Sequence, residues 1–134
     1  MTLRELTYSH KPVKVNGNLD TEITGIELDS RKCKPNTVFV AIRGTQTDGH
    51  AYIDKAIELG ATCIICESEP RNPLPGITYA IYENTADIVG PLATTFYGNP
   101  SKKMKLVGVT GTNGKTTIAT TLYNIIRRMG IKAG

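Results

Sequence analysis

A glycine-rich turn between a strand pattern and a helix pattern constrains this chain most. Residues 105–110 form an apolar run that predicts a buried strand, and Gly111-Thr-Asn-Gly-Lys-Thr-Thr117 follows directly. The helix predicted after the turn carries its apolar side chains on one face, at Ile118, Leu122, Ile125, Ile126 and Met129. Glycines let successive N–H groups point at phosphate oxygens, and a helix N-terminus adds partial positive charge. The order of strand, turn and helix therefore predicts a phosphate-binding loop.

Two side chains of this turn suit a nucleoside triphosphate. Lys115 is placed to reach the β- and γ-phosphates, and the Thr116 hydroxyl is placed to hold Mg²⁺. The general pattern has glycine five residues before Gly114, where this chain has Val109, so the loop is a variant. The alternative interpretation is a glycine turn that carries a surface lysine.

One strand, one loop and one helix cannot complete a catalyst for phosphoryl transfer. The reaction also needs further metal ligands and a positioned nucleophile, and a strand buried on both faces needs neighbours. The sequence ends at Ala133-Gly134, where the next strand should begin. We therefore expect residues 100–134 to be the start of a larger, truncated domain, and the chain alone to be catalytically inactive.

Residues 1–99 carry alternating strand and helix patterns. Strands are predicted over residues 23–28, 38–42, 61–66 and 77–82, one helix over 50–59 and another after the capping residue Asn84. Residues 44–49 form a loop with glycine at each end. Pro91 lies inside the second helix pattern, so that helix is either kinked there or begins later. These elements predict a small α/β domain with a mixed sheet and helices.

The charge distribution supports a domain boundary near residue 100, where Tyr97-Gly-Asn-Pro-Ser101 breaks the helix pattern. Residues 1–100 hold nine basic and twelve acidic side chains, whereas residues 101–134 hold seven basic and no acidic ones. A basic tail raises a nucleic-acid interpretation. The tail is patterned as strand and helix and lacks a recognised nucleic-acid motif or interleaved surface aromatics, so we expect no nucleic-acid partner.

Cys63 and Cys66 have the C-x-x-C spacing found in redox and zinc sites. They lie in a predicted buried strand, where residues three apart face opposite sides. A redox pair would instead begin a helix, where the thiolate is stabilised. We interpret both as small core residues.

No membrane or secretory segment is apparent. No stretch approaches the roughly 18 apolar residues of a membrane span, and the first residues lack the apolar core of a signal peptide. With 40% hydrophobic and 21% charged residues, the chain can bury a core. We expect a soluble cytoplasmic protein with no membrane partner.

Several motifs together resemble one enzyme family. The segment Val107-Gly-Val-Thr-Gly-Thr-Asn-Gly-Lys-Thr-Thr117 closely resembles the ATP loop of the Mur ligases of peptidoglycan synthesis. Five further segments resemble their N-terminal domain and interdomain junction: Leu28-Asp-Ser-Arg31, Val38–Gly44, Asp48–Ala56, Gly60-Ala61 and Phe96–Ser101. The resemblance implies a UDP-sugar-binding domain over residues 1–99 and the first strand, phosphate loop and helix of an ATP-binding domain over residues 100–134.

The resemblance also implies a reaction. ATP would phosphorylate the D-glutamate side chain of UDP-MurNAc-L-Ala-D-Glu, with Mg²⁺ neutralising charge. The amine of diaminopimelate or lysine would then attack the acyl phosphate. Family members are cytoplasmic, and a monomer is expected. The alternatives are the sister ligase that adds D-Ala-D-Ala and a non-catalytic nucleotide-sugar-binding module. Thr112-Asn113 and Asp48-Gly-His50 favour the ligase that adds the third amino acid.

By the same resemblance, each nucleotide has its own contacts. The implied UDP-sugar contacts are Leu28, Ser30, Thr45, Gln46 and Thr47. The implied ATP contacts are Gly111, Thr112, Asn113, Gly114, Lys115, Thr116 and Thr117, with Lys115 as the catalytic residue and Thr116 at the metal. Asp29 and Arg31 are either further nucleotide contacts or a structural ion pair.

Overall fold

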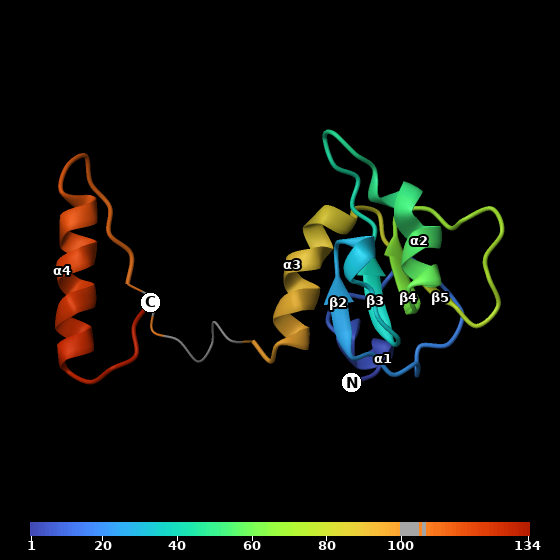
Figure 1. The fold of residues 1–134 in the computed structure, drawn as a ribbon, viewed down its shortest axis with the longest axis horizontal. Helices are drawn as coiled ribbons and strands as arrows, with labels where there is room; N and C mark the ends of the chain where they lie inside the picture. The colour runs from blue at the N-terminus through green and yellow to red at the C-terminus, as the bar shows by residue number, and fades with distance from the viewer. Residues whose placement is uncertain (100–104, 106) are drawn as a thin grey trace. The chain divides into compact units, whose positions relative to one another are not determined.

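The computed structural model describes residues 1–99, 105 and 107–134 (Figure 1). By its contacts the chain divides into two compact units, residues 1–100 and 101–134. The predicted boundary at residue 100, together with Ser101 and Leu106 of the quoted motifs, lies outside the described residues.

The first unit is built on a five-stranded mixed sheet in the order β1-β5-β4-β3-β2. Strands β2 to β5 run parallel, and β1 pairs with β5 in the antiparallel sense. The strands are β1 (Lys14–Asn16), β2 (Gly25–Glu27), β3 (Thr37–Val40), β4 (Ala61–Cys66) and β5 (Thr78–Ile81). The mixed α/β sheet predicted from the sequence is confirmed.

Helices cover both faces of this sheet (Figure 1). They are α1 (Leu3–Leu6), α2 (Ile53–Glu58) and α3 (Thr85–Phe96), with short 3₁₀ turns η1 (Ser30–Lys32) and η2 (Gly49–Tyr52). Side chains of α1 and α3 bury one face, and those of α2 bury the other. In the described part of the chain, no helix is both long and apolar enough to cross a membrane.

Strand β4 lies at the centre and is buried on both faces, as its continuous apolar run predicts. Cys63 packs against the α1–α3 side and Cys66 against the α2 side. Burial raises the pKa of both thiols to about 11, so neither is a thiolate at neutral pH. The interpretation of the C-x-x-C spacing as core packing is confirmed.

Helix α3 begins at Thr85, so the alternative of a later start is wrong. The Asn84 side chain accepts hydrogen bonds from the N–H groups of Ala86 and Asp87, which caps the helix as predicted. Pro91 lies inside this helix and has no N–H to donate to the preceding turn. Leu92, the next residue, is fully buried, and its packing together with the cap holds the helix in place.

The second unit contains helix α4 (Lys115–Arg128), which confirms the helix predicted after the glycine turn. The strand predicted over residues 105–110 is wrong for the residues that are described, since Lys105 and residues 107–110 form no strand. A strand is stabilised by hydrogen bonds to a neighbour, and no strand pairs with this segment in the described part of the chain.

Gly60, between α2 and β4, is expected to tolerate no side chain. Its φ is +113°, and a Cβ there would lie 2.7 Å from the Pro35 nitrogen. Such a backbone costs an L-residue about 1–2 kcal/mol, and forced overlap costs about 1–3 kcal/mol more. Gly60→Ala should therefore lower the free energy of unfolding by about 2–5 kcal/mol, measured by urea denaturation.

The matched control is Gly76→Ala. Gly76 also has a positive φ, +82°, but a Cβ there meets nothing within 4 Å. Only the backbone cost of about 1–2 kcal/mol should appear. Equal losses in the two variants would contradict a role for the close approach to Pro35.

Candidate functional site

A cleft of about 670 Å³ opens where strands β2 and β3 end. In sheets with parallel strands, ligands bind at the carboxyl ends, because the chain leaves the strands there in loops and helix starts. The volume lies within the range usual for small-molecule sites. The lining residues are Leu28, Asp29, Ser30, Arg31, Phe39, Ile42, Gly44, Thr47, Gly49, Tyr52 and Lys55.

The cleft combines an apolar wall with polar groups at its rim. Phe39 is buried in β3, and Leu28 and Tyr52 keep about half of their surface exposed. Ser30, at the start of η1, is only 7% exposed. Lys55 of α2 contributes a cation, paired with Glu58 at 3.2 Å on the protein surface. An apolar surface beside a few hydroxyls and cations suits a flat ring that carries anionic groups.

The glycine-flanked loop, residues 44–49, forms one wall of the cleft, and its tip is residues 44–47. Arg43 and Asp48 pair as an antiparallel bridge at its base, and the Gly44 N–H donates to the Thr47 carbonyl at 3.0 Å. Gly49 then donates to the Ile42 carbonyl at 2.8 Å. A Cβ on Gly49 would lie 2.7 Å from the Ile42 nitrogen, so glycine is required there. The loop is therefore a short hairpin with a closed base.

Asp29 and Arg31 form an ion pair beside the cleft. The carboxylate accepts the Arg31 Nε and Nη2 hydrogen bonds at 2.9 and 2.8 Å, and it also accepts the Arg31 backbone N–H. These side-chain hydrogen bonds lower the pKa of Asp29 to about 2. Of the two alternatives, the ion pair is present, and it shapes the η1 turn that carries Ser30.

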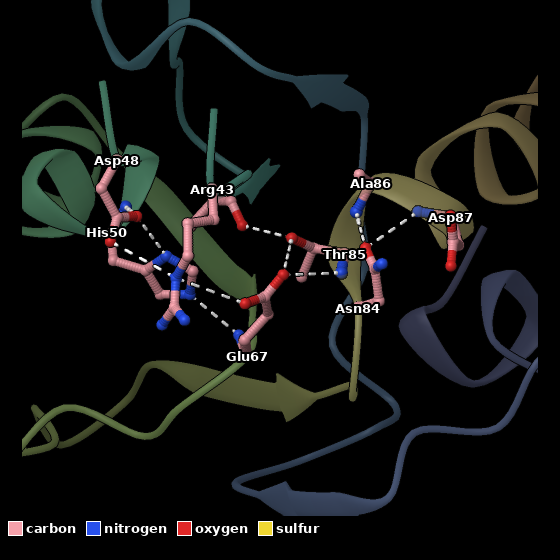
Figure 2. A network of polar contacts seen from close by, with 9 residues as sticks. Arg43, Asp48, His50, Glu67, Asn84, Thr85, Ala86 and Asp87 are labelled. Atoms are coloured by element: carbon pink, nitrogen blue, oxygen red, sulfur yellow. Dashed lines mark hydrogen bonds and ion pairs between the residues drawn. The ribbon is translucent and has the colours of Figure 1, made fainter. Parts of the chain in front are cut away.

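A polar network anchors the base of the loop to the ends of β4 and β5 (Figure 2). The His50 Nδ1 lies 2.6 Å from Asp48 Oδ1, and His50 Nε2 accepts the Glu67 backbone N–H at 2.9 Å. Arg43 lies 3.5 Å from the Glu67 carboxylate. The other carboxylate oxygen of Glu67 accepts the Thr85 backbone N–H at 3.2 Å. Arg43, Glu67 and Thr85 each follow a different parallel strand, so this edge of the sheet gathers them.

The predicted phosphate loop has an open geometry. Gly111 and Gly114 have φ of +146° and +76°, and a Cβ on Gly114 would meet nothing within 4 Å. Gly114 takes the N-cap position of α4 without a side-chain cap, which leaves the first N–H groups without a capping side chain. Lys115 and Thr116 occupy the first helical turn, and both are exposed. The residue types and backbone fit a phosphate group.

The structure brings only some of the predicted residues together. Leu28, Ser30 and Thr47 line the cleft, whereas Thr45 and Gln46 are exposed at the loop tip and outside its lining. The roles of all five residues as nucleotide contacts, like those of residues 111–117, stay predictions. Tyr52 and Lys55 were not predicted from the sequence. Their only signal was a place in a helix pattern next to the glycine loop.

Comparison with known proteins identifies a family. A sequence profile described as "Mur ligase family, catalytic domain" matches residues 22–97. A UDP-N-acetylmuramoyl-L-alanyl-D-glutamate--2,6-diaminopimelate ligase of Bacteroides fragilis is 57% identical over 134 residues, which is 100% of this chain and 28% of the relative. The chain thus spans 28% of the length of that curated relative.

Solved structures show the same fold. MurF from Acinetobacter baumannii superposes with a TM-score of 0.72 at 24% identity, covering 96% of this chain and 28% of that one. At this identity the likeness concerns the fold alone. The MurF ligase from Thermotoga maritima in complex with ADP gives a TM-score of 0.55 at 34% identity, covering 81% of this chain and 24% of that one.

The Asp29–Arg31 pair predicts an acid-shifted titration. The carboxyl carbon of Asp29, followed by NMR, should titrate with a midpoint near 2. Arg31→Ala should raise that midpoint towards the usual value of about 4. Because the folded-state pKa is the lower one, the pair stabilises the fold above pH about 4, and that stability is lost as pH falls towards 2.

Lys32→Ala is the control for net charge. Lys32 is the neighbouring cation and contributes least to the shift, so the midpoint should stay near 2. A wild-type midpoint near 4 would contradict the ion pair.

Proposed function

The chain belongs to the Mur ligase family, and on that premise we propose that it forms the nucleotide-binding front part of a ligase for UDP-MurNAc-L-Ala-D-Glu. Residues 1–99 would hold the UDP moiety, and residues 100–134 would begin the ATP-binding domain. The observation that carries the proposal is the cleft at the ends of β2 and β3, with the glycine-flanked loop as its wall.

The chemistry of the cleft supports a uridine nucleotide. Leu28 and Tyr52, each about half exposed, offer apolar surface to a base. The Ser30 and Thr47 hydroxyls, with loop N–H groups, offer donors to a diphosphate. In this arrangement Thr45 and Gln46, at the loop tip, would reach the part of the nucleotide that extends beyond the cleft.

The glycine turn before α4 supports an ATP site. Its backbone N–H groups would receive phosphate oxygens, and Lys115 would offset their negative charge. The Thr116 hydroxyl would hold Mg²⁺, which would supply charge neutralisation during phosphoryl transfer. The T. maritima relative is described in complex with ADP, which agrees with a nucleotide here.

The ligase reaction assigns a distinct part to each of these sites. The cleft would hold the UDP end of the precursor, and the D-glutamate carboxylate would extend towards ATP. Lys115 would stabilise charge as the phosphoryl group moves to that carboxylate, forming an acyl phosphate. The amine of the second substrate would attack the acyl carbon and release phosphate.

The proposed second substrate is diaminopimelate. Relatives that are 55–57% identical to this chain carry that amino acid in their names. We place the reaction in the cytoplasm, where ATP is available, and expect a monomer. Addition of D-Ala-D-Ala, the reaction named for one of the similar solved structures, is the weaker alternative. The MurF ligase of T. maritima is 34% identical to this chain, compared with 57% for the diaminopimelate ligase of B. fragilis.

UDP is expected to bind the 134-residue chain and to shift the amide signals of Leu28, Ser30 and residues 45–47 in NMR titrations. Ser30→Ala removes one hydroxyl from the cleft. It should weaken UDP binding by about two- to tenfold, because a neutral hydrogen bond contributes about 0.5–1.5 kcal/mol. Ser9→Ala, at an exposed serine away from the cleft, is the control and should bind UDP normally. Absence of these shifts at millimolar UDP would contradict the proposed site.

Lys115→Ala is expected to lower turnover far more than stability. The test joins residues 1–134 to the remaining length of the B. fragilis relative and measures steady-state ligation beside thermal melts. Removing a charge stabiliser from a preorganised site costs on the order of 10²–10³ in rate. Lys132→Ala, at another exposed lysine after α4, should leave turnover unchanged. Near-normal turnover in Lys115→Ala would overturn the phosphate-loop assignment.

A further inference from the structure

The Asp48-Gly49-His50 motif has a structural position that the proposed contacts leave unexplained. It lies where the tip of the glycine-flanked loop, residues 44–47, returns to the sheet, and none of its three residues is among the proposed nucleotide contacts. We propose that His50 is a positioning residue that fixes this loop for the nucleotide by tying its base to the end of β4. The proposal rests on the proposed UDP site.

The hydrogen bonds of His50 define its proton state. A backbone N–H can only donate, so the Glu67 N–H at 2.9 Å requires a lone pair on His50 Nε2. The single proton of the neutral ring is then on Nδ1, where it donates to Asp48 Oδ1 at 2.6 Å. The ring therefore bridges Asp48 at the loop base and Glu67 after β4 (Figure 2). Its two hydrogen bonds together select one tautomer.

His50 replaces a backbone partner at the point where the hydrogen bonds between β3 and β4 stop. The Ala41 N–H still donates to the Ile65 carbonyl at 2.8 Å, as in a parallel ladder. The next ladder bond would join the Glu67 N–H to the Ala41 carbonyl. That carbonyl instead accepts the buried Thr85 hydroxyl at 2.7 Å, and His50 Nε2 receives the Glu67 N–H. His50 thus accepts the hydrogen bond of the Glu67 N–H, which has no partner on the neighbouring strand because the chain has already left β3.

Both ends of the loop are connected to Glu67. The end at Asp48 is connected to the Glu67 backbone through His50, and Arg43, at the other end, lies 3.5 Å from the Glu67 carboxylate. Glu67 is itself held by Thr85, which is fully buried at the start of α3. The His50 side chain is 14% exposed, so this bond lies largely out of water. The loop base is consequently fixed while its tip stays free to meet a ligand.

Two near-isosteric variants separate the two bonds of the ring. His50→Gln places an amide oxygen near the position of Nε2 and keeps an acceptor for the Glu67 N–H. It loses the ring bond to Asp48, but Asp48 Oδ1 still accepts the backbone N–H of residue 50, at 2.9 Å in the wild type. His50→Asn places an amide nitrogen near the position of Nδ1 and keeps the donor to Asp48, but it loses that acceptor. Asp54→Asn, at an exposed residue one turn further on, controls for a change on the same segment.

The experiment measures backbone ¹⁵N relaxation of residues 44–49 in the free 134-residue chain and the UDP dissociation constant of each variant. We expect His50→Asn to loosen the loop and weaken UDP binding about tenfold, whereas His50→Gln and Asp54→Asn stay close to wild type. A merely structural histidine would change the melting temperature without this split between the Asn and Gln variants.

The two readouts keep the inference separate from the proposed function. Wild-type loop order in His50→Asn overturns the inference alone, and so does a loosened loop with unchanged UDP affinity. Absence of UDP binding by the wild type overturns the proposed function and, with it, the positioning role. The ring nitrogen signals of wild-type His50 add a test that needs no variant. A proton on Nε2 instead of Nδ1 overturns the bridge.

Discussion

Burial of β4 on both faces is the constraint from which the rest of the first unit follows. Every residue of the strand except Thr62 is buried. A strand without a solvent face needs a neighbour on each edge and a helix layer on each side. Strands β3 and β5 pair with its two edges, α1 and α3 cover one side, and α2 covers the other. The polar groups of the cleft and of the network around Glu67 gather at the rim where the parallel strands end.

That rim explains why the cleft lies next to the polar network of His50, Glu67 and Thr85. The chain leaves β2 at Leu28, β3 at Ala41, β4 at Glu67 and β5 at Tyr82, and each exit brings polar groups to the same edge. The exits of β2 and β3 enclose the cleft, while the exits of β4 and β5 supply Glu67 and Thr85. A ligand in the cleft would therefore contact a loop whose base is joined to the central strand.

Elements with a local signal could be predicted from the sequence. The run of residues 61–66 predicts β4, Asn84 predicts the start of α3, and Gly60 marks the end of α2. The short elements α1 and β1 were missed. The four-residue α1 has a local signal, the capping box of Thr2 and Glu5, but it is too short to show a helical period, whereas β1 is held by a distant partner. β1 pairs with β5, and the Lys14 ammonium lies 2.5 Å from Glu69. The apolar run of residues 105–110 predicted a strand, but Lys105 and residues 107–110 form none, because pattern alone cannot supply a pairing neighbour.

The residues of the candidate site also differ in whether the sequence marked them. Leu28, Ser30 and Thr47, which the family resemblance implied, line the cleft, whereas Phe39 and Ile42 had only the pattern of core strand residues. The anchoring contacts span 17 residues from His50 to Glu67 and 44 from Ala41 to Thr85, distances over which no sequence period operates. Only the fold brings these groups together.

Intermolecular nuclear Overhauser effects between bound UDP and the protein would locate the uracil ring on the protein. A uridine site in the cleft predicts contacts from the uracil ring protons to the Leu28 methyl groups and the Tyr52 ring, at the ends of β2 and β3. Contacts to Tyr82 and Ile88, which line a separate hollow beside α3, would contradict it.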